Sequence, residues 1–240
     1  MTVNANNAVL NGGYYALSGG KTTVTLTGDT VLTAPETTSG FSAVLGSLPT
    51  RPATVTRTCT GNSCSYTVTI GVSIRGVIGF ITGKNMAGGA ISGASYTATT
   101  EAGTVVNGNL VAEDNSEMTL TIGGALNGYA DAWYGSTADI TVTGDWIGDS
   151  TAYYTGTNTI DLTGTWTGDA DAYLGGTLTA AIEEGAVWTG DAVSEGDESD
   201  GYGLLTADIF GTWNGNAESN YGAVLNANIA STGVWNGDAK

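Results

Sequence analysis

The stretch TGTWTGDADAY, residues 163–173, contains one copy of a motif that organises the second half of the chain. The motif reads Trp-x-Gly-(Asp/Asn)-(Ala/Ser), and a degenerate copy, LNGYA, starts at Leu126. Counted from Leu126, successive copies start 20, 20, 22, 25 and 22 residues apart. This period fits one coil of a solenoid, whereas a β-propeller blade needs roughly 40 to 45 residues. The five complete copies start at Trp146, Trp166, Trp188, Trp213 and Trp235.

The residues before each tryptophan predict a strand with one buried face. Ile140 and Val142 lie six and four residues before Trp146, and the equivalent positions of the other copies are mostly apolar. This period of two indicates a strand, and the tryptophan continues it, so we expect the indole to point inward from the strand or onto the turn that follows. The glycine two residues later permits backbone angles that other residues resist. Gly and β-branched Thr are frequent in every segment, which disfavours helices.

These patterns predict an all-β fold, a parallel β-solenoid with about 20 to 25 residues per coil. We expect it to be right-handed, as parallel crossovers usually are, with like residues stacked about 4.8 Å apart. Residues 120–240 would form the regular repeats, and residues 1–119 irregular coils of the same solenoid with a protruding excursion at 34–68. A separate small β domain in the N-terminal half is the alternative.

The two cysteines, Cys59 and Cys64, lie inside the expected excursion. Two alternating, strand-like runs flank the turn-prone residues 60–63, which predicts an antiparallel hairpin. In such a hairpin the two cysteines could face each other at disulfide distance. We favour a structural disulfide, which would indicate an extracellular protein, and free or redox-active thiols are the alternative.

Charge is distributed unevenly along the chain. Residues 1–100 contain two acidic and five basic residues, whereas residues 101–240 contain 21 acidic residues and one basic residue, Lys240. An acidic surface repels phosphate, so we expect no binding to nucleic acid. No apolar run is long enough to span a bilayer, so we expect no membrane insertion. Histidine is absent, which excludes Ser-His-Asp and Cys-His catalysis and most zinc sites.

Carboxylates recur at equivalent positions of the repeats. Asp149, Asp169 and Asp191 form one such set, and Asp131 and Asp171 lie two coils apart. A glycoside hydrolase needs two carboxylates about 5 to 9.5 Å apart. Stacked coils place carboxylates at such distances throughout a solenoid, so the spacing does not distinguish a catalytic pair from a structural one. Asn216 replaces Asp in the first set, which favours a turn residue that accepts main-chain hydrogen bonds over a catalytic acid.

The segment SEGDESDGYG, residues 194–203, is the strongest candidate for binding calcium. Its acidic residues crowd one loop, but the loop does not match the twelve-residue calcium pattern. A solvated acidic loop is the favoured interpretation, and we therefore expect no cofactor and no dedicated metal site. The loop contains four acidic residues: Glu195, Asp197, Glu198 and Asp200.

Aromatic residues form a second ladder and are the best candidate for a binding site. Trp133, Tyr153 and Tyr173 lie seven residues after the motif start in three consecutive coils, and Tyr134 and Tyr154 follow one residue later. If the first three point outward, they form an aromatic strip suited to sugar rings or to a protein partner. If they point inward, they are part of the core. The pattern leaves both orientations open.

The strings GAVWTGDA, GTWTGDADAY and STGVWNGDAK resemble β-helix repeats of bacterial surface proteins, notably autotransporter passenger domains and related adhesins. The resemblance covers residues 120–240 well and residues 1–119 only in general character. It implies a non-catalytic adhesin fragment, secreted or displayed at the bacterial cell surface. Its partner would be a host protein, such as an immunoglobulin or a matrix protein, or a glycan.

Two other functions fit the same fold. Exposed end coils could stack end to end, which would make the chain a structural stalk or a self-assembling fibre subunit. A polysaccharide-degrading β-helix enzyme is the second alternative. It would need a groove with converging acids and a base, and the near absence of basic residues after residue 100 argues against it.

Overall fold

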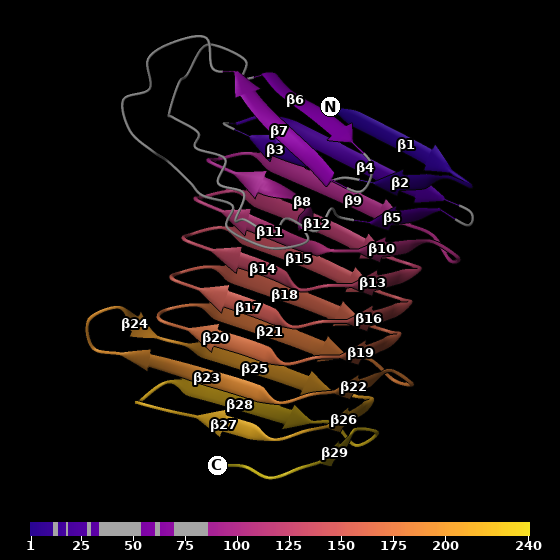
Figure 1. The fold of residues 1–240 in the computed structure, drawn as a ribbon. Helices are drawn as coiled ribbons and strands as arrows, with labels where there is room; N and C mark the ends of the chain where they lie inside the picture. The colour runs from indigo at the N-terminus through magenta and orange to yellow at the C-terminus, as the bar shows by residue number, and fades with distance from the viewer. Residues whose placement is uncertain (12–13, 18, 28–29, 34–53, 61–62, 70–85) are drawn as a thin grey trace.

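The computed structural model describes residues 1–11, 14–17, 19–27, 30–33, 54–60, 63–69 and 86–240 and shows a parallel β-solenoid (Figure 1). In this part of the chain every coil contributes strands to three long sheets, which we call sheets A, B and C. The elements assigned over the described ranges are all strands. Among the described residues, no helix has the length and hydropathy needed to span a bilayer. The predicted fold class is confirmed.

The strands of each sheet recur at coil intervals along the chain. Sheet A contains β1 (Thr2–Asn6), β4 (Lys21–Thr27), β9 (Ser95–Thr100), β12 (Glu117–Ile122), β15 (Thr137–Val142), β18 (Thr157–Leu162), β21 (Thr177–Ile182), β25 (Leu204–Ile209) and β28 (Val224–Ile229). Sheet B contains β2 (Val9–Asn11), β5 (Val31–Thr33), β10 (Val105–Asn107), β13 (Ala125–Asn127), β16 (Asp145–Ile147), β19 (Thr165–Thr167), β22 (Val187–Thr189), β26 (Thr212–Asn214) and β29 (Val234–Asn236). Sheet C contains β3 (Tyr14–Leu17), β8 (Met86–Ile91), β11 (Asn109–Glu113), β14 (Ala130–Trp133), β17 (Ser150–Tyr153), β20 (Ala170–Tyr173), β23 (Ala192–Asp197), β24 (Gly201–Tyr202) and β27 (Ala217–Ser219).

Strand pairing places equivalent residues of successive coils side by side. Ile140 pairs with Ile160, 20 residues later, and most coils are close to this length. From β9 onward, the longest step in sheet A joins Ile182 to Ile209, 27 residues later, because that coil carries the acidic loop. All pairs within the three sheets are parallel except β23 with β24.

The solenoid continues across the predicted excursion. The chain leaves the three sheets after β5 and rejoins them at β8, and β3 pairs with β8, β4 with β9 and β5 with β10. Between them, β6 (Thr54–Thr60) and β7 (Ser63–Thr69) form an antiparallel hairpin (Figure 1).

The register of this hairpin places Cys59 opposite Cys64. The predicted pairing of the two positions is therefore confirmed at the level of the backbone. Their side chains lie outside the described residues, so the disulfide stays a prediction. The rest of the predicted excursion at 34–68, apart from the two strands, also lies outside the described residues.

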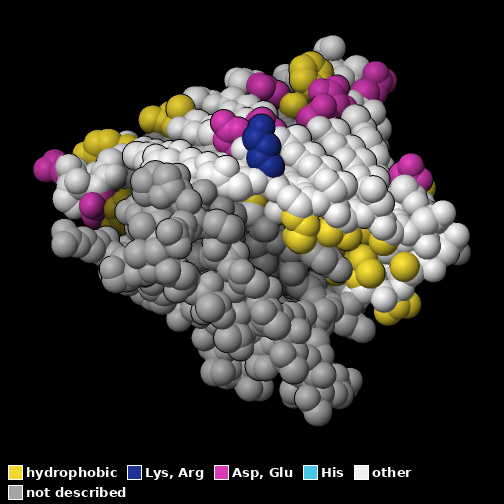
Figure 2. Space-filling view, turned by 90° about the horizontal axis from the view of Figure 1, so that it is seen from above, with side chains coloured by type: hydrophobic (Ala, Val, Ile, Leu, Met, Phe, Trp, Pro, Cys, Tyr) yellow, Lys and Arg dark blue, Asp and Glu magenta, His cyan; other side chains and the backbone are white. Residues whose placement is uncertain are grey.

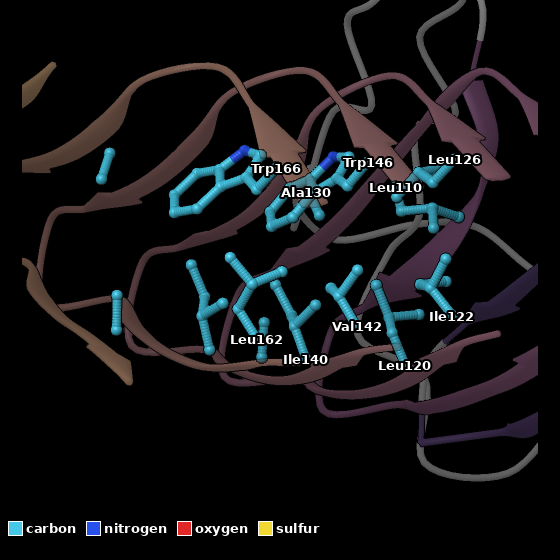
Figure 3. Packing of buried hydrophobic residues seen from close by; sticks show 14 of the residues in the cluster. Leu110, Leu120, Ile122, Leu126, Ala130, Ile140, Val142, Trp146, Leu162 and Trp166 are labelled. Atoms are coloured by element: carbon cyan, nitrogen blue, oxygen red, sulfur yellow. The ribbon is translucent and has the colours of Figure 1, made fainter. Parts of the chain in front are cut away.

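Inward-facing side chains of sheet A form two aliphatic columns along the axis. One column contains Leu120, Ile140 and Ile160 and the other Ile122, Val142 and Leu162, all of them buried. The side chains of neighbouring coils stack directly on one another (Figure 3). This arrangement confirms the predicted strand with one buried face, and each buried side chain contributes roughly 1.5 to 3 kcal/mol of hydrophobic stabilisation.

The tryptophans of sheet B form one continuous stack opposite these aliphatic columns (Figure 3). Ring centroids of successive indoles are 4.7, 4.9, 4.7 and 5.0 Å apart, and no pair is tilted by more than 8°. This distance is the spacing of neighbouring strands, about 4.8 Å. The first four are buried, and Trp235 of the last coil is half-buried. We call Trp146, Trp166, Trp188, Trp213 and Trp235 the tryptophan stack.

The glycine of each motif binds the tryptophan of the next coil. The Nε1–H of Trp166 donates to the carbonyl oxygen of Gly148 over 2.8 Å, and the Nε1–H of Trp188 donates to that of Gly168 over 2.9 Å. Glycine is needed here because a Cβ on Gly168 would lie 2.0 Å from the carbonyl oxygen of Gly148. The backbone angle φ of Gly168 is +155°, which other residues rarely adopt.

The last residue of the motif is Ala or Ser because its side chain, in sheet C, packs into the same core as the indoles. The inward residues of sheet C include Ala130, Ser150 and Ala170, all of them fully buried. In the earlier coil, where Val106 takes the place of tryptophan, the inward residue of sheet C is Leu110. Large and small side chains thus compensate across the core, as close packing requires.

Candidate functional site

The Gly-Asp positions form a structural ladder on the outside of the turn between sheets B and C. Oδ1 of Asp149 accepts a hydrogen bond from the main-chain N–H of Asp169 over 2.9 Å, and Oδ1 of Asp169 accepts one from Asp191 over 2.8 Å. Oδ1 of Asp191 in turn accepts a hydrogen bond from the main-chain N–H of Asn216 over 2.7 Å. The predicted role as a main-chain acceptor is confirmed, but the amide belongs to the next coil rather than to the same turn.

The outer face of sheet C carries the predicted aromatic strip, which comprises Trp133, Tyr153 and Tyr173. Trp133 pairs with Tyr153, and Tyr153 with Tyr173, in consecutive strands. Each follows a fully buried alanine, so each points outward, and each side chain is half-buried. The structure thus answers the open question of orientation in favour of the outer face.

Aromatic rings make contact around the corner between sheets C and A. Tyr134 and Tyr154 stack with ring centroids 5.4 Å apart and a tilt of 14°. Tyr153 meets Tyr154 edge-on at 4.5 Å and Trp133 edge-on at 6.4 Å. Ring contacts thus join four of the five residues predicted as binding residues, and the fifth, Tyr173, lies beside Tyr153 in the neighbouring strand. We call the five residues the aromatic edge: Trp133, Tyr134, Tyr153, Tyr154 and Tyr173.

The corner residues hold their side chains in an unfavourable backbone conformation. Tyr134, Tyr154 and Leu174 have φ values of 52°, 43° and 48°, in the left-handed region. For L-residues this region costs roughly 1 to 2 kcal/mol each, and Asn or Gly would occupy it more easily. Tyr134 is nevertheless 46% exposed, so burial of the side chain does not explain the choice of residue. Such strain is typical of functional positions.

Two exposed tyrosines that the sequence analysis did not select continue this corner. Tyr221 is 76% exposed, and its φ of 54° matches that of Tyr134 and Tyr154. Tyr202, at the end of the acidic loop, lies beside Gly222, where a Cβ would meet its ring at 3.2 Å. The signal that marks these corners is a large residue followed by glycine, as in Tyr134-Gly135 and Tyr221-Gly222.

Carboxylates border the aromatic edge. Asp171 lies beside Tyr173 on the outer face of sheet C and accepts a hydrogen bond from its hydroxyl over 3.2 Å. Partial burial, with further contributions from Asp169 and Asp149, raises the pKa of Asp171 to about 6, although the hydroxyl of Tyr173 opposes the shift. Burial and the charge of Asp171 likewise raise the pKa of Tyr173.

Asp131 lies two coils away from Asp171 in the same outward column. It is only 4% exposed, and burial raises the pKa of its carboxyl well above the ordinary value, against a hydrogen bond from the N–H of Thr151. The pair thus occupies one face, as the coil spacing predicts. The carboxyl of Asp131 is too enclosed for a polymer lying on the surface to reach it without a local rearrangement.

The acidic loop caps its own turn. Oδ1 of Asp197 accepts hydrogen bonds from the N–H groups of Ser199 and Asp200, both over 2.8 Å, and from the hydroxyl of Ser199 over 2.7 Å. These bonds lower the pKa of Asp197. Within the described residues no group of three or more acidic or cysteine side chains is arranged to hold a metal ion. The geometry therefore gives no support to a calcium site in this loop.

Acidic side chains also occur away from the aromatic edge. Seen from above the first coil, Asp and Glu side chains lie at several places around the molecule (Figure 2). Next to the aromatic edge, Glu195 pairs with Tyr173 in sheet C, and the main chain of Asp200 lies against Gly175. The aromatic edge is thus a partly exposed part of the surface with carboxylates beside it, in which Tyr134 and Tyr154 hold a left-handed conformation. Neither a protein-family model, nor a curated protein, nor a solved structure matches this chain.

Proposed function

We propose that this solenoid is a non-catalytic binding module that recognises a host protein or a glycan through the aromatic edge. The observation that carries the proposal is the outward, contiguous placement of five aromatic residues, two of them in a left-handed conformation. Tyr and Trp offer large contact areas at low entropic cost, which is why they are frequent at binding sites. Display at the bacterial cell surface or secretion is part of the proposal.

The test removes the aromatic rings without disturbing the turn. Asparagine tolerates the left-handed conformation, so Tyr134→Asn, Tyr154→Asn and Tyr221→Asn should together leave the melting temperature within about 5 °C of wild type. The wild-type protein and this triple variant are screened against arrays of host glycans and of host proteins, immunoglobulins and matrix proteins included, with and without calcium. We expect a saturable ligand that the triple variant no longer binds.

The control removes exposed apolar side chains elsewhere. Ile147 on sheet B and Phe210 at the turn between sheets A and B are exposed, so Ile147→Ser with Phe210→Ser gives a matched variant. This control variant should bind the ligand as the wild-type protein does. Ligands that bind all three proteins equally would show that the aromatic edge is not the site. If no arrayed protein or glycan binds, the stalk or fibre alternative is favoured. Cleavage of an arrayed glycan would favour the enzyme alternative.

A further inference from the structure

The charge around the aromatic edge restricts the chemistry of its ligand. Residues 101–239 contain no Lys or Arg, so no basic side chain from this half of the chain neutralises the carboxylates. An anionic glycan or an acidic protein surface would therefore be repelled. A positively charged partner would be attracted, and this attraction would also accelerate its association.

Three tyrosines of the edge lie close to carboxylates, and the first of them, Tyr134, is near Glu113. Tyr173 is bonded to Asp171 and pairs with Glu195 in the neighbouring strand. Tyr154 lies within electrostatic range of Asp200, whose main chain packs against the next corner. Aromatic rings and carboxylates thus lie close together at this edge, and together they fit cations, which bind both to ring faces and to carboxylates.

We propose that the aromatic edge binds an arginine-rich, extended polypeptide segment of a partner protein, an inference that rests on the binding function proposed above. A guanidinium group is planar, stacks on tyrosine rings and donates paired hydrogen bonds to a carboxylate, so it uses both components of the edge at once. An ammonium group lacks the planar stacking surface. A neutral sugar would use the rings but would gain little from the surrounding charge.

The experiment measures the affinity of a fluorescein-labelled oligo-arginine peptide by anisotropy at low and at physiological ionic strength. An oligo-citrulline peptide of equal length keeps the shape of the side chain and removes its charge. We expect saturable binding of oligo-arginine that weakens with salt, at least about tenfold weaker binding of oligo-citrulline, and an intermediate affinity for oligo-lysine.

Two variants and one matched control locate the site. Tyr134→Asn with Tyr154→Asn removes the stacked rings, and Asp171→Asn with Glu195→Gln removes two charges beside them. Each double variant should weaken oligo-arginine binding by at least about fivefold. Asp139→Asn with Asp161→Asn removes the same charge from the exposed face of sheet A and should change the affinity by less than about twofold.

The outcomes separate this inference from the proposed function. Equal weakening by the sheet A control would show non-specific attraction to an acidic protein and would overturn the inference. A neutral glycan that binds wild type but not the tyrosine variant, without peptide binding, would keep the binding function and reject the basic peptide. Tighter binding of an oligomer of glucosamine than of oligo-arginine would assign the edge to an amino-sugar polymer instead. If no ligand responds to either double variant, both proposals fail.

Discussion

At the scale of single residues, the motif glycines are required by the main chain of the neighbouring coil. The Cβ of an alanine at position 168 would lie 2.0 Å from the carbonyl oxygen of Gly148, which is itself bonded to Trp166. Gly168→Ala should therefore lower the free energy of unfolding by more than about 2 kcal/mol. Chemical denaturation measures the loss.

Thr167 provides the control for this prediction because it is adjacent in sequence and its side chain points into solvent. Thr167→Ala should change the free energy of unfolding by less than about 0.5 kcal/mol. Similar losses for the two variants would mean that the strand, rather than the close approach at glycine, is sensitive to substitution.

The tryptophan stack gives a second residue-scale prediction. Trp188 lies between two indoles and donates to Gly168, whereas Trp235 has one indole neighbour and is half-buried. Trp188→Phe removes the hydrogen bond and leaves a buried carbonyl oxygen with one partner fewer, so it should cost about 2 to 3 kcal/mol. Trp235→Phe should cost less than half as much, and thermal unfolding of both variants checks the difference.

The even spacing of Ile140, Val142 and Trp146 is compatible with an inward tryptophan, and the structure shows this orientation although β15 ends at Val142 and Trp146 belongs to β16. The sequence does not predict the hydrogen bonds that explain the rest of the motif. The acceptor of the Trp166 indole, Gly148, lies 18 residues away, and the amide that Asp149 binds lies 20 residues away. These partners become neighbours only when the coil closes.

At the scale of strands, β18 contains a polar residue in the core. Asn158 is fully buried between Ala138 and Leu178, and its Oδ1 has no hydrogen-bond partner. Its amide donates to the hydroxyl of Ser150 over 2.9 Å, and that hydroxyl also donates to the carbonyl oxygen of Ala130. An unpartnered buried oxygen costs about 1 to 3 kcal/mol.

Asn158→Leu should therefore raise the free energy of unfolding by about 1 kcal/mol, since Leu178 already occupies the same position in the next coil. The hydroxyl of Ser150 keeps its bond to Ala130 in this variant. Urea denaturation gives the difference, with Asn158→Ala as the control that removes the amide without filling the space. A destabilised leucine variant would indicate that the core at this level is already full.

The outward orientation of the aromatic strip follows from an alternation that continues through the turn between sheets B and C. Trp146, Ser150 and Ala152 all point inward, so the alternation continues from sheet B into sheet C. Tyr153, seven residues after Trp146, must then point outward. The left-handed corner at Tyr154 could not be inferred in this way, because a tyrosine rarely adopts that conformation.

At the scale of the whole molecule, burial of carboxyl groups makes stability depend on pH. The carboxyl of Asp171 has a pKa of about 6 in the folded chain and an ordinary value of 3.8. Below about pH 4 it is protonated in both states. Between about pH 4 and 6 the unfolded chain loses this proton and the folded chain keeps it, so the contribution to stability falls as the pH rises.

We therefore expect the denaturation midpoint to be higher at pH 5 than at pH 7.5, as measured in urea at constant ionic strength. Asp171→Asn should reduce this difference and should be more stable than wild type at pH 7.5. Asp161→Asn, on the exposed face of sheet A, is the control and should retain the wild-type dependence. An unchanged dependence in Asp171→Asn would place its origin at other groups, of which the buried Asp131 is the first to test.

The sequence predicts the architecture of the whole molecule because each copy of the repeated motif shows the same pattern of strand and turn residues. It predicts the site less well. The proximity of Asp200 to Tyr154 arises from a loop that returns across an earlier coil, and no local pattern encodes that contact. The chemistry proposed for the partner rests on the charge of residues 101–240 together with that contact.

The tryptophan stack also has an optical consequence. Five indoles held 4.7 to 5.0 Å apart and nearly parallel will share electronic excitation, so their absorption and circular dichroism differ from those of isolated rings. The coupling between two rings is lost when the coils that carry them separate. The absorption and circular dichroism of the tryptophan stack therefore depend on how many of the coils that carry these indoles are folded. These signals could be used to follow stepwise unfolding of these coils without an added label.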